Sequence, residues 1–228
     1  MSVSLSPLEW IRPPRQARTQ RSLERLLDAA EALLREKGFD DMHIAEIARR
    51  AETSVASFYR RFRDKDALLH ALHERHCEEA FATADDVLHE DRWKDAEIRE
   101  ILSCVFPFVI EALKRHEALE RAIFQRMLSD ESMRQRISGL RRHVMNRVST
   151  LLLARSHEVN HPNPRLAVSF GVGQAGALLT EYYTLGARES EIVSTSDQQI
   201  AEELTCSLCS YLCLSEHAES LQLEGITP

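Results

Sequence analysis

The chain has 228 residues, of which 43% are apolar and 29% charged, and this mixture excludes a disordered or fibrous protein and is enough for a sizeable core. Its net charge of −7 excludes a chain that is basic throughout, but the charge is uneven. Residues 1–76 carry 14 Lys and Arg against 12 Asp and Glu, or +2, whereas residues 77–228 carry 15 against 24, or −9. A locally basic face for DNA phosphates is compatible with this distribution.

Residues 1–18 contain three prolines and no helical period, which predicts a flexible basic arm. Arginines recur every third residue at its end, and we expect Arg15 and Arg18 to reach DNA phosphates or the minor groove. Solvated charge ahead of a helix is the alternative. The arm has no apolar signal region, and the longest apolar run, near Val148–Ala154, is too short to span a bilayer, so we expect a cytoplasmic protein without membrane contact.

Three helices are predicted next. The first covers residues 19–37, with Thr19 as N-cap and Gly38 after its end. Two short helices follow at residues 42–50 and 54–62, separated by a three-residue turn, which is the pattern of a helix-turn-helix. Phe58 and Phe62 would pack the last helix inward. The opposite face offers small and basic side chains for a major groove and its phosphates: Ser54, Val55, Ala56, Ser57, Tyr59, Arg60, Arg61 and Lys65.

Many positions of this region fit one family pattern at fixed offsets: Ala29-Ala30, Leu33-Leu34, Gly38-Phe39, Ile47-Ala48, Ala51, Ser54, Tyr59, Phe62, Lys65 and Leu68. Residues 26–69 thereby resemble the DNA-binding head of the TetR family of bacterial repressors. The resemblance implies an all-α fold of about nine helices, with a three-helix helix-turn-helix head (residues 19–65) and a larger helical body for ligand binding and dimerisation (residues 66–228). It also implies a homodimeric repressor that binds double-stranded DNA at a pseudo-palindromic operator and is released by a small-molecule effector.

Three departures from the family pattern fall on or beside the DNA face. His43 stands where a phosphate-binding threonine is usual, and a histidine could also donate to phosphate. Glu52 and Thr53 replace the usual Gly-Val of the turn, which costs backbone freedom if the φ angle of Glu52 is positive. Arg61 replaces a usual His or Tyr and should strengthen phosphate binding.

The rest of the chain predicts further helices at residues 65–90, 95–114, 117–128, 131–155, 164–185 and 197–214, without strand alternation. Pro107 should kink or split its helix. Small residues in 164–185, including Gly171, predict close packing of another helix or a ligand. Ser196 and Gln199 form a capping-box pattern. By the family resemblance, the helices at 164–185 and 197–214 form the dimer interface.

The five cysteines do not have the spacing of a disulfide framework, which favours reduced thiols. Redox sensing by Cys77 or Cys104 is a weaker alternative. Cys206, Cys209, Cys213 and His217 share a helical stripe, but positions i and i+7 lie about 10 Å apart along a helix, too far for one ion. We therefore predict buried apolar thiols there and no metal.

The sequence lacks the common local signatures of hydrolases and nucleotide-binding enzymes, so we expect no enzyme, no catalytic residues and no cofactor. A ligand cavity is expected among the body helices, with apolar walls and a few polar groups. Its candidate residues are Phe106, Phe108, Glu111, Phe124, Met127, His143, Asn146, Arg147, Gln174 and Tyr182. The alternative function is a DNA-binding regulator without a small-molecule effector, which is constitutive or controlled by a protein partner.

Overall fold

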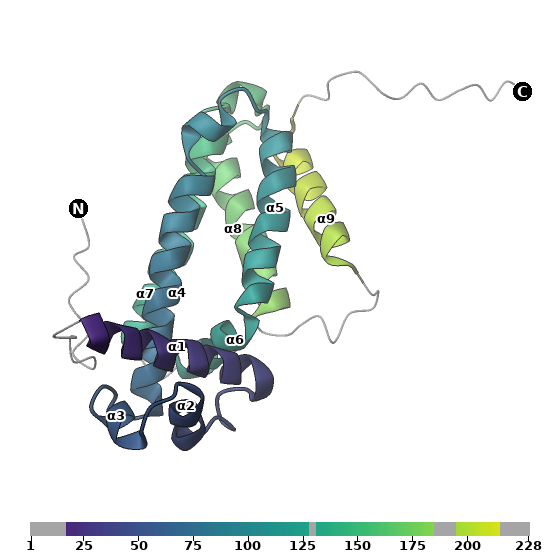
Figure 1. The fold of residues 1–228 in the computed structure, drawn as a ribbon. Helices are drawn as coiled ribbons and strands as arrows, with labels where there is room; N and C mark the ends of the chain where they lie inside the picture. Colours follow the sequence, from purple (N-terminus) through teal and green to yellow (C-terminus); the bar gives the residue numbers. More distant parts are fainter. Residues whose placement is uncertain (1–16, 128–130, 185–194, 215–228) are drawn as a thin grey trace, which may run out of the picture.

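The computed structural model describes residues 17–127, 131–184 and 195–214, and all regular structure in these ranges is helical. The helices are α1 (Ala17–Lys37), α2 (Ile44–Arg50), α3 (Val55–Tyr59), α4 (Lys65–Val87), α5 (Ile98–Arg115), α6 (Glu117–Met127), α7 (Glu131–Leu153), α8 (Pro164–Tyr183) and α9 (Asp197–Tyr211), with short 3-10 helices at Glu90–Trp93 and Ser156–Glu158. The all-α prediction is confirmed. Helices α1 to α3 lie at one end of the molecule, and α4, α5, α7, α8 and α9 extend away from them (Figure 1). None of the described helices is long and apolar enough to cross a membrane.

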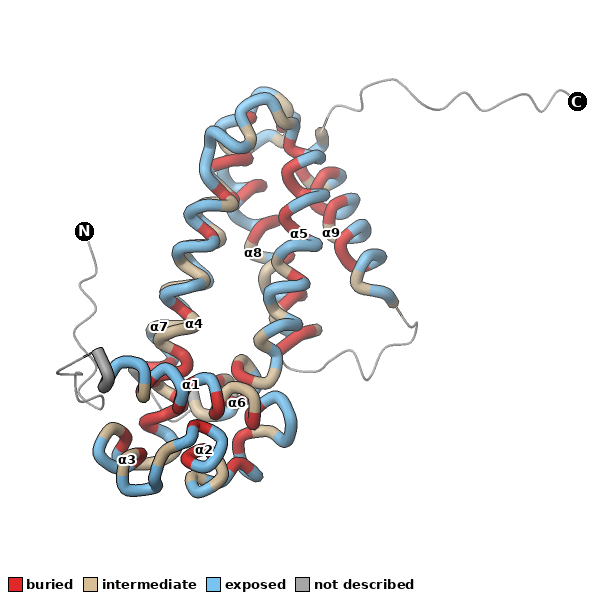
Figure 2. Tube along the Cα trace, in the orientation of Figure 1, coloured by how far each residue is buried: buried red, intermediate tan, exposed pale blue. Residues whose placement is uncertain are grey.

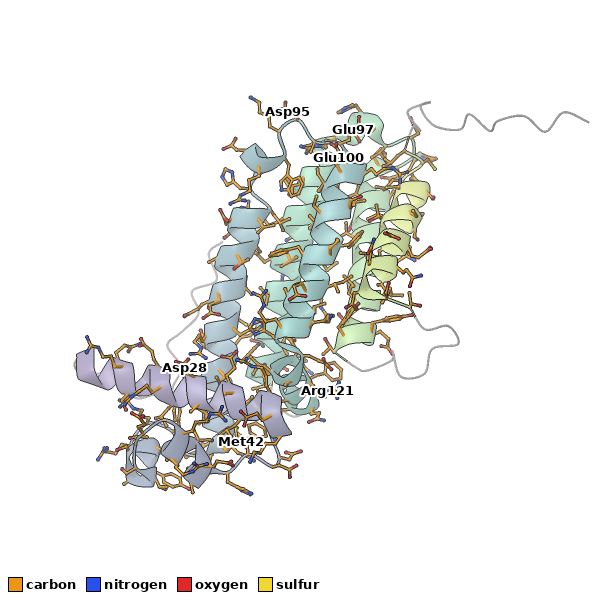
Figure 3. The ribbon with its side chains drawn as sticks, turned by 45° about the vertical axis from the view of Figure 1, so that its right-hand side comes forward. Asp28, Met42, Asp95, Glu97, Glu100 and Arg121 are labelled. Atoms are coloured by element: carbon orange, nitrogen blue, oxygen red, sulfur yellow. The ribbon has the colours of Figure 1, made fainter. Side chains whose placement is uncertain are left out.

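Most helix ends are determined by local sequence. Gly38 follows α1 with a φ of +80°, and the Asp64 carboxylate caps α4 by accepting from the Ala67 N–H. The predicted capping box of Ser196 and Gln199 starts α9. Another box, Glu97 with Glu100, starts α5 at the end of the molecule far from Met42 in the head (Figure 3). The predicted N-cap at Thr19 is wrong, because α1 already begins at Ala17.

Helix α5 continues through Pro107, so of the two predicted outcomes, a kink or a split, the split does not occur. Proline has no N–H for the carbonyl of Ser103, four residues earlier. Both residues are exposed, which leaves this carbonyl within reach of water.

Helix α4, which was predicted to run to residue 90, ends at Val87 instead. The Trp93 indole N–H donates to the Val87 carbonyl (2.8 Å) across the following turn.

Two apolar cores hold the structure together. The core of the head contains side chains of α1, α2 and α3, but it also includes Leu68 and Leu72 of α4 and Leu119 and Ile123 of α6. The predicted domain boundary at residue 65 therefore falls inside this core. The body core is formed by the distal part of α4 with α5, α7, α8 and α9.

All five cysteines are free; Cys77 and Cys209 are buried, whereas Cys104, Cys206 and Cys213 are exposed. The prediction of buried thiols on α9 thus holds for Cys209 alone, and His217 lies outside the described residues.

Gly171 of α8 allows a close approach of α9, as the small residues of this helix predicted. A Cβ atom at this position would lie 2.3 Å from Leu208 Cδ1 and 3.3 Å from Tyr211 Cδ1. Leu208 is itself buried, so its side chain has little room to move. We expect Gly171→Val to lower the free energy of unfolding by about 1–3 kcal/mol through overpacking.

Urea denaturation followed by circular dichroism measures this effect. Gly139→Ala on α7 is the matched control, because no atom lies within 4 Å of its added Cβ. Alanine has a higher helix propensity than glycine, so Gly139→Ala should raise the free energy of unfolding by up to about 1 kcal/mol. A Gly171→Val variant as stable as the natural chain would contradict the close α8–α9 contact.

Candidate nucleic-acid interface

The turn between α2 and α3 is built by main-chain hydrogen bonds that end α2. The Thr53 N–H donates to the Ala48 carbonyl (2.9 Å) and the Glu52 N–H to the Arg49 carbonyl (3.2 Å), which is the Schellman arrangement. This arrangement needs a left-handed residue, and Glu52 takes it with a φ of +51°. The expected conformational strain at Glu52 is therefore confirmed. Its exposed carboxylate lies 3.6 Å from Arg25 of α1.

Helix α3 is anchored by two aromatic rings. Phe58 and Phe62 are fully buried, with ring centroids 5.4 Å apart, as the sequence predicted. On the outer side, Val55 and Tyr59 are 40% and 53% exposed. Exposed stretches lie along the outer side of α2 and α3, at the end of the molecule (Figure 2). An outward aromatic and aliphatic pair on a short helix suits contact with thymine methyl groups and the DNA backbone.

The hydroxyl groups of α3 are already arranged by local hydrogen bonds. Ser54 caps the helix by accepting from the Ser57 N–H (3.1 Å), and the two serine hydroxyls lie 3.0 Å apart. Arg60 donates to the Ser57 hydroxyl (2.5 Å). These contacts occupy two of the three hydrogen-bonding sites of the Ser57 hydroxyl, which leaves one for a base. Ala56 is exposed and has no polar side-chain atom.

Several basic groups surround α3. Arg60 is exposed and Arg61 is half-buried; burial, followed by the charge of Arg60, lowers the pKa of Arg61. Arginine still carries its charge at neutral pH, so the pair presents two adjacent positive charges. Arg63, which the sequence reading did not select, is 82% exposed and pairs with Asp64 at 2.7 Å. His43 is exposed at the start of α2 and makes no capping hydrogen bond, so its imidazole is accessible for a phosphate.

Lys65 has a structural position that the sequence did not indicate. Its ammonium group donates to the carbonyls of Phe39 (2.7 Å) and Asp40 (3.1 Å) and lies 4.5 Å from the centre of the Phe39 ring. On the same ring, Arg126 of α6 lies at 3.9 Å and bonds to Asp40 and Asp66. Lys65 and Arg126 thus join the α1–α2 loop to α4 and α6. Sequence reading missed Arg126 because its partners are some 60 and 86 positions away.

Two predicted DNA contacts cannot be placed. Arg15 lies outside the described residues. Arg18 lies in α1, but its side chain is outside the described part of the structure.

The predicted ligand residues stay a prediction, and the structure places those that it describes in different surroundings. Phe106 is buried in the body core, whereas Phe108, Glu111, Asn146 and Gln174 are exposed. His143 and Arg147 bind Asp85 of α4, at 2.9 Å and 3.1 Å. Phe124 and Tyr182 are half-buried, and the Met127 side chain is outside the described part. Helical periodicity could not predict these positions, because it does not specify which neighbour covers a given face.

Two open pockets are present on the body. The first, of about 460 Å³, lies at the end of the body far from the head, and its lining includes Asp91, Glu97 and Glu158. The second, of about 670 Å³, lies between α5 and α9, and its lining includes Arg99, Glu111 and Cys206. Glu111 is the one residue of the predicted ligand set that lines either of them.

Residues 26–72, which contain the whole helix-turn-helix and the start of α4, match the sequence model of bacterial regulatory proteins of the tetR family. The head of the chain is a TetR-family DNA-binding head. The resemblance found in the sequence is confirmed, and the chain is a transcriptional regulator with such a head. A search of curated proteins found no match to this chain.

Solved structures of TetR-family regulators share the fold along most of the chain. A regulator assigned to this family from Mesorhizobium loti has a TM-score of 0.67 at 18% identity, covering 87% of this chain and 98% of the other. A tetR-family regulator from Streptomyces coelicolor has a TM-score of 0.65 at 16% identity, and the match covers 84% of this chain and 80% of the other. The transcriptional regulator FadR from Bacillus subtilis, in complex with stearoyl-CoA, has a TM-score of 0.59 at 19% identity, covering 82% and 98%.

The left-handed backbone at Glu52 predicts a stabilising substitution. Glu52→Gly is expected to raise the free energy of unfolding by about 1 kcal/mol, because glycine accepts a positive φ without a steric cost. The lost contact with Arg25 is exposed and contributes little. Chemical denaturation measures the change. Glu52→Ala is the control, since it removes the charge and keeps the strain; equal stabilisation by both variants would assign the effect to charge.

Proposed function

We propose that this TetR-family regulator is a homodimeric repressor that holds a pseudo-palindromic operator and releases it when a small molecule binds the body. The observation that carries DNA binding is the outer face of α3, where Val55 and Tyr59 are exposed beside Arg60 and Arg61 while Phe58 fixes the helix from behind. The proposed phosphate contacts are Tyr59, Arg61 and His43. The proposed base contacts are Val55, Ala56 and Ser57, with Ser54 capping the helix.

The described body offers an apolar face for a second copy. On α8, Leu166, Phe170 and Leu178 are 58%, 52% and 40% exposed, and with the exposed Gln174 they recur every fourth residue. An exposed stripe of mostly apolar side chains is typical of a protein–protein interface. A two-fold dimer would bury the stripe against its own copy, with α9 beside it. Such a dimer would set two heads about 34–36 Å apart for successive major grooves.

The proposal of a small-molecule effector has support from the fold of FadR, whose structure contains stearoyl-CoA. An effector would release DNA only by binding more tightly to a state in which the heads are wrongly spaced. The scattered positions of the predicted ligand residues favour the alternative, a regulator without a small-molecule effector. We assign neither chemistry nor cofactor to the chain, and we place it in the cytoplasm.

Selection from randomised DNA, followed by fluorescence anisotropy in low salt, tests the DNA-binding part. Enrichment of a pseudo-palindrome with two half-sites about one helical turn apart is expected. Recovery of no preferred sequence would contradict the proposal. Titration of the complex with acyl-CoA, with free coenzyme A as the control, tests an acyl-CoA effector, for which release of DNA by acyl-CoA alone is expected.

Sedimentation velocity tests the dimer. Phe170→Asp together with Leu178→Asp should give a monomer, because two charges would be buried without partners. Phe108→Asp on α5, also an exposed aromatic position at 41%, is the control and should stay dimeric. A natural chain that sediments as a monomer would contradict the dimer.

A further inference from the structure

A group of titratable side chains lies where the head meets the body. Helix α4 contributes His70, His73 and His76, one every three residues, and therefore on one side of the helix. His116 at the end of α5 and Glu120 of α6 complete the group, which we call the histidine joint. The proposed DNA and effector contacts do not include any of these five residues.

The first contact of the histidine joint connects α4 with α6. His76 Nε2 lies 3.0 Å from Glu120 Oε1, and the ring centroids of His76 and His116 are 4.3 Å apart. Burial raises the pKa of the Glu120 carboxyl, but the hydrogen bond with His76 and the nearby histidines outweigh burial, so this pKa lies below its ordinary value. Burial, followed by His76, lowers the pKa of His116.

The second contact leaves one nitrogen without a partner. His73 is 1% exposed, and its Nε2 lies 3.2 Å from the thiol of Cys77. Its Nδ1 is buried and has no hydrogen-bond partner. Burial lowers the pKa of His73 to about 4; the attraction of Glu120 opposes this, and repulsion from His76, Arg136 and His70 adds to it. Burial also raises the pKa of the Cys77 thiol to about 12, so the thiol stays neutral.

Other charged groups around the histidine joint are paired across the same elements. Arg75 of α4 bonds to Glu31 and to Asp28 of α1, both at 2.6 Å; Asp28 is labelled in Figure 3. Arg136 of α7 pairs with Glu74 of α4. Arg115 precedes His116, and Glu78 lies near Cys77. The carboxylates of Glu31, Asp28 and Glu74 are therefore already paired with arginines, and none of them is the acceptor of a proton on His73 Nδ1.

The histidine joint lies between two helices that both contribute to the core of the head. The same part of α4 supplies Leu69 and Leu72 to the head core, and α6 supplies Leu119 and Ile123. Any separation of α6 from α4 would therefore open the core that fixes the head on the body. A proton on Nδ1 of His73 would bring a charged N–H into a buried site with no acceptor, and such a group needs water or a new partner.

We propose that the histidine joint is a proton-sensitive hinge, in which uptake of a proton by His73 favours a state with α6 moved away from α4 and the head loosened from the body. Neutral His73 stabilises the packed state fully above its ordinary pKa of 6.5, and this contribution is lost as the pH falls toward about 4. Ionised Glu120 also stabilises the packed state, and this contribution is lost as the pH falls below its ordinary pKa of 4.5. From the two pKa values of His73, 6.5 and about 4, the ratio of separated to packed molecules should rise about tenfold between about pH 8 and about pH 5.5.

Amide hydrogen exchange of the full chain without DNA tests the hinge. After correction for the intrinsic pH dependence of exchange, protection of α6 should fall about tenfold from about pH 8 to about pH 5.5, while α9 keeps its protection. His73→Leu should remove this fall, and His73→Phe, which keeps an aromatic ring, is the second variant. His89→Leu, at an exposed histidine far from the head, is the matched control and should behave as the natural chain.

Three results would overturn the hinge: unchanged protection of α6 in the natural chain, an equal fall in α6 and α9, or the same fall in α6 after His73 is replaced. The first two need no variant, so they decide the question even if the variants do not fold. The consequence for operator affinity rests on the function proposed above, whereas the exchange experiment does not. Failure to bind DNA and failure of the hinge are therefore separate results.

Discussion

Phe58→Ala is expected to lower the free energy of unfolding of the head by about 3–5 kcal/mol, because a fully buried ring is replaced by a cavity. The ring packs at 5.4 Å from Phe62 and at 5.5 Å, edge to face, from Tyr59. Its loss removes the largest buried side chain of α3 from the core of the head. Because stability of a single domain is only about 5–15 kcal/mol, this one change should leave α3 poorly ordered.

Urea denaturation and hydrogen exchange of α2 and α3 measure this effect together. Val55→Ala, on the exposed face of the same helix, is the control and should change stability by less than about 0.5 kcal/mol. A loss below about 1 kcal/mol for Phe58→Ala would mean that the ring does not fix the recognition helix. Operator affinity should fall for the Phe58 variant even at low salt, since the outer face of α3 is no longer preorganised.

Arg61→Ala is expected to weaken operator binding roughly 10- to 100-fold, corresponding to the loss of one charge-assisted hydrogen bond to phosphate. The slope of log affinity against log salt concentration should also fall by about one, because one fewer counterion is released. Tyr59→Ala should weaken binding without changing this slope, since tyrosine is neutral. Anisotropy titrations across a salt series therefore distinguish the two roles.

The matched control is Arg92→Ala, an exposed arginine in the 3-10 helix at the far end of the body, where it pairs with Asp86 at 2.7 Å. It changes the net charge as Arg61→Ala does and should leave affinity and slope nearly unchanged. If the Arg92 and Arg61 variants weaken binding equally, net charge controls binding and the proposed phosphate contact is wrong.

Local features of this chain were predictable because short-range geometry determines them. The helix stop at Gly38, the serine cap at Ser54 and the box of Ser196 with Gln199 each involve residues within four positions, so sequence spacing is sufficient. The inward packing of Phe58 followed from the same periodicity. The predicted N-cap at Thr19 was wrong because a capping residue has to lie at the end of the helix, and α1 begins two residues earlier, at Ala17.

Features of the site that depend on distant residues were not predictable. Lys65 matches a family position for which we expected a phosphate contact, yet its ammonium group holds the Phe39 and Asp40 carbonyls, 26 and 25 positions away. The ligand residues were chosen for lying beside apolar stripes. Whether such a residue faces a cavity, the core or solvent depends on which helix packs over it. Phe106 lies in the body core, whereas Phe108 and Gln174, for example, are exposed.

By itself, the sequence determined that the chain is helical, that residues 42–62 form a helix-turn-helix and that the head is of the TetR type, because periodicity, caps and fixed offsets are local properties. Only the tertiary structure decided that the core of the head extends into α6 and that Arg126 joins α6 to the α1–α2 loop. It also decided that His73 is buried, with Nε2 beside Cys77 and Nδ1 without a partner. These facts arise from contacts between helices far apart in the chain. Burial and partner choice, which set pKa values and rigidity, depend on those contacts.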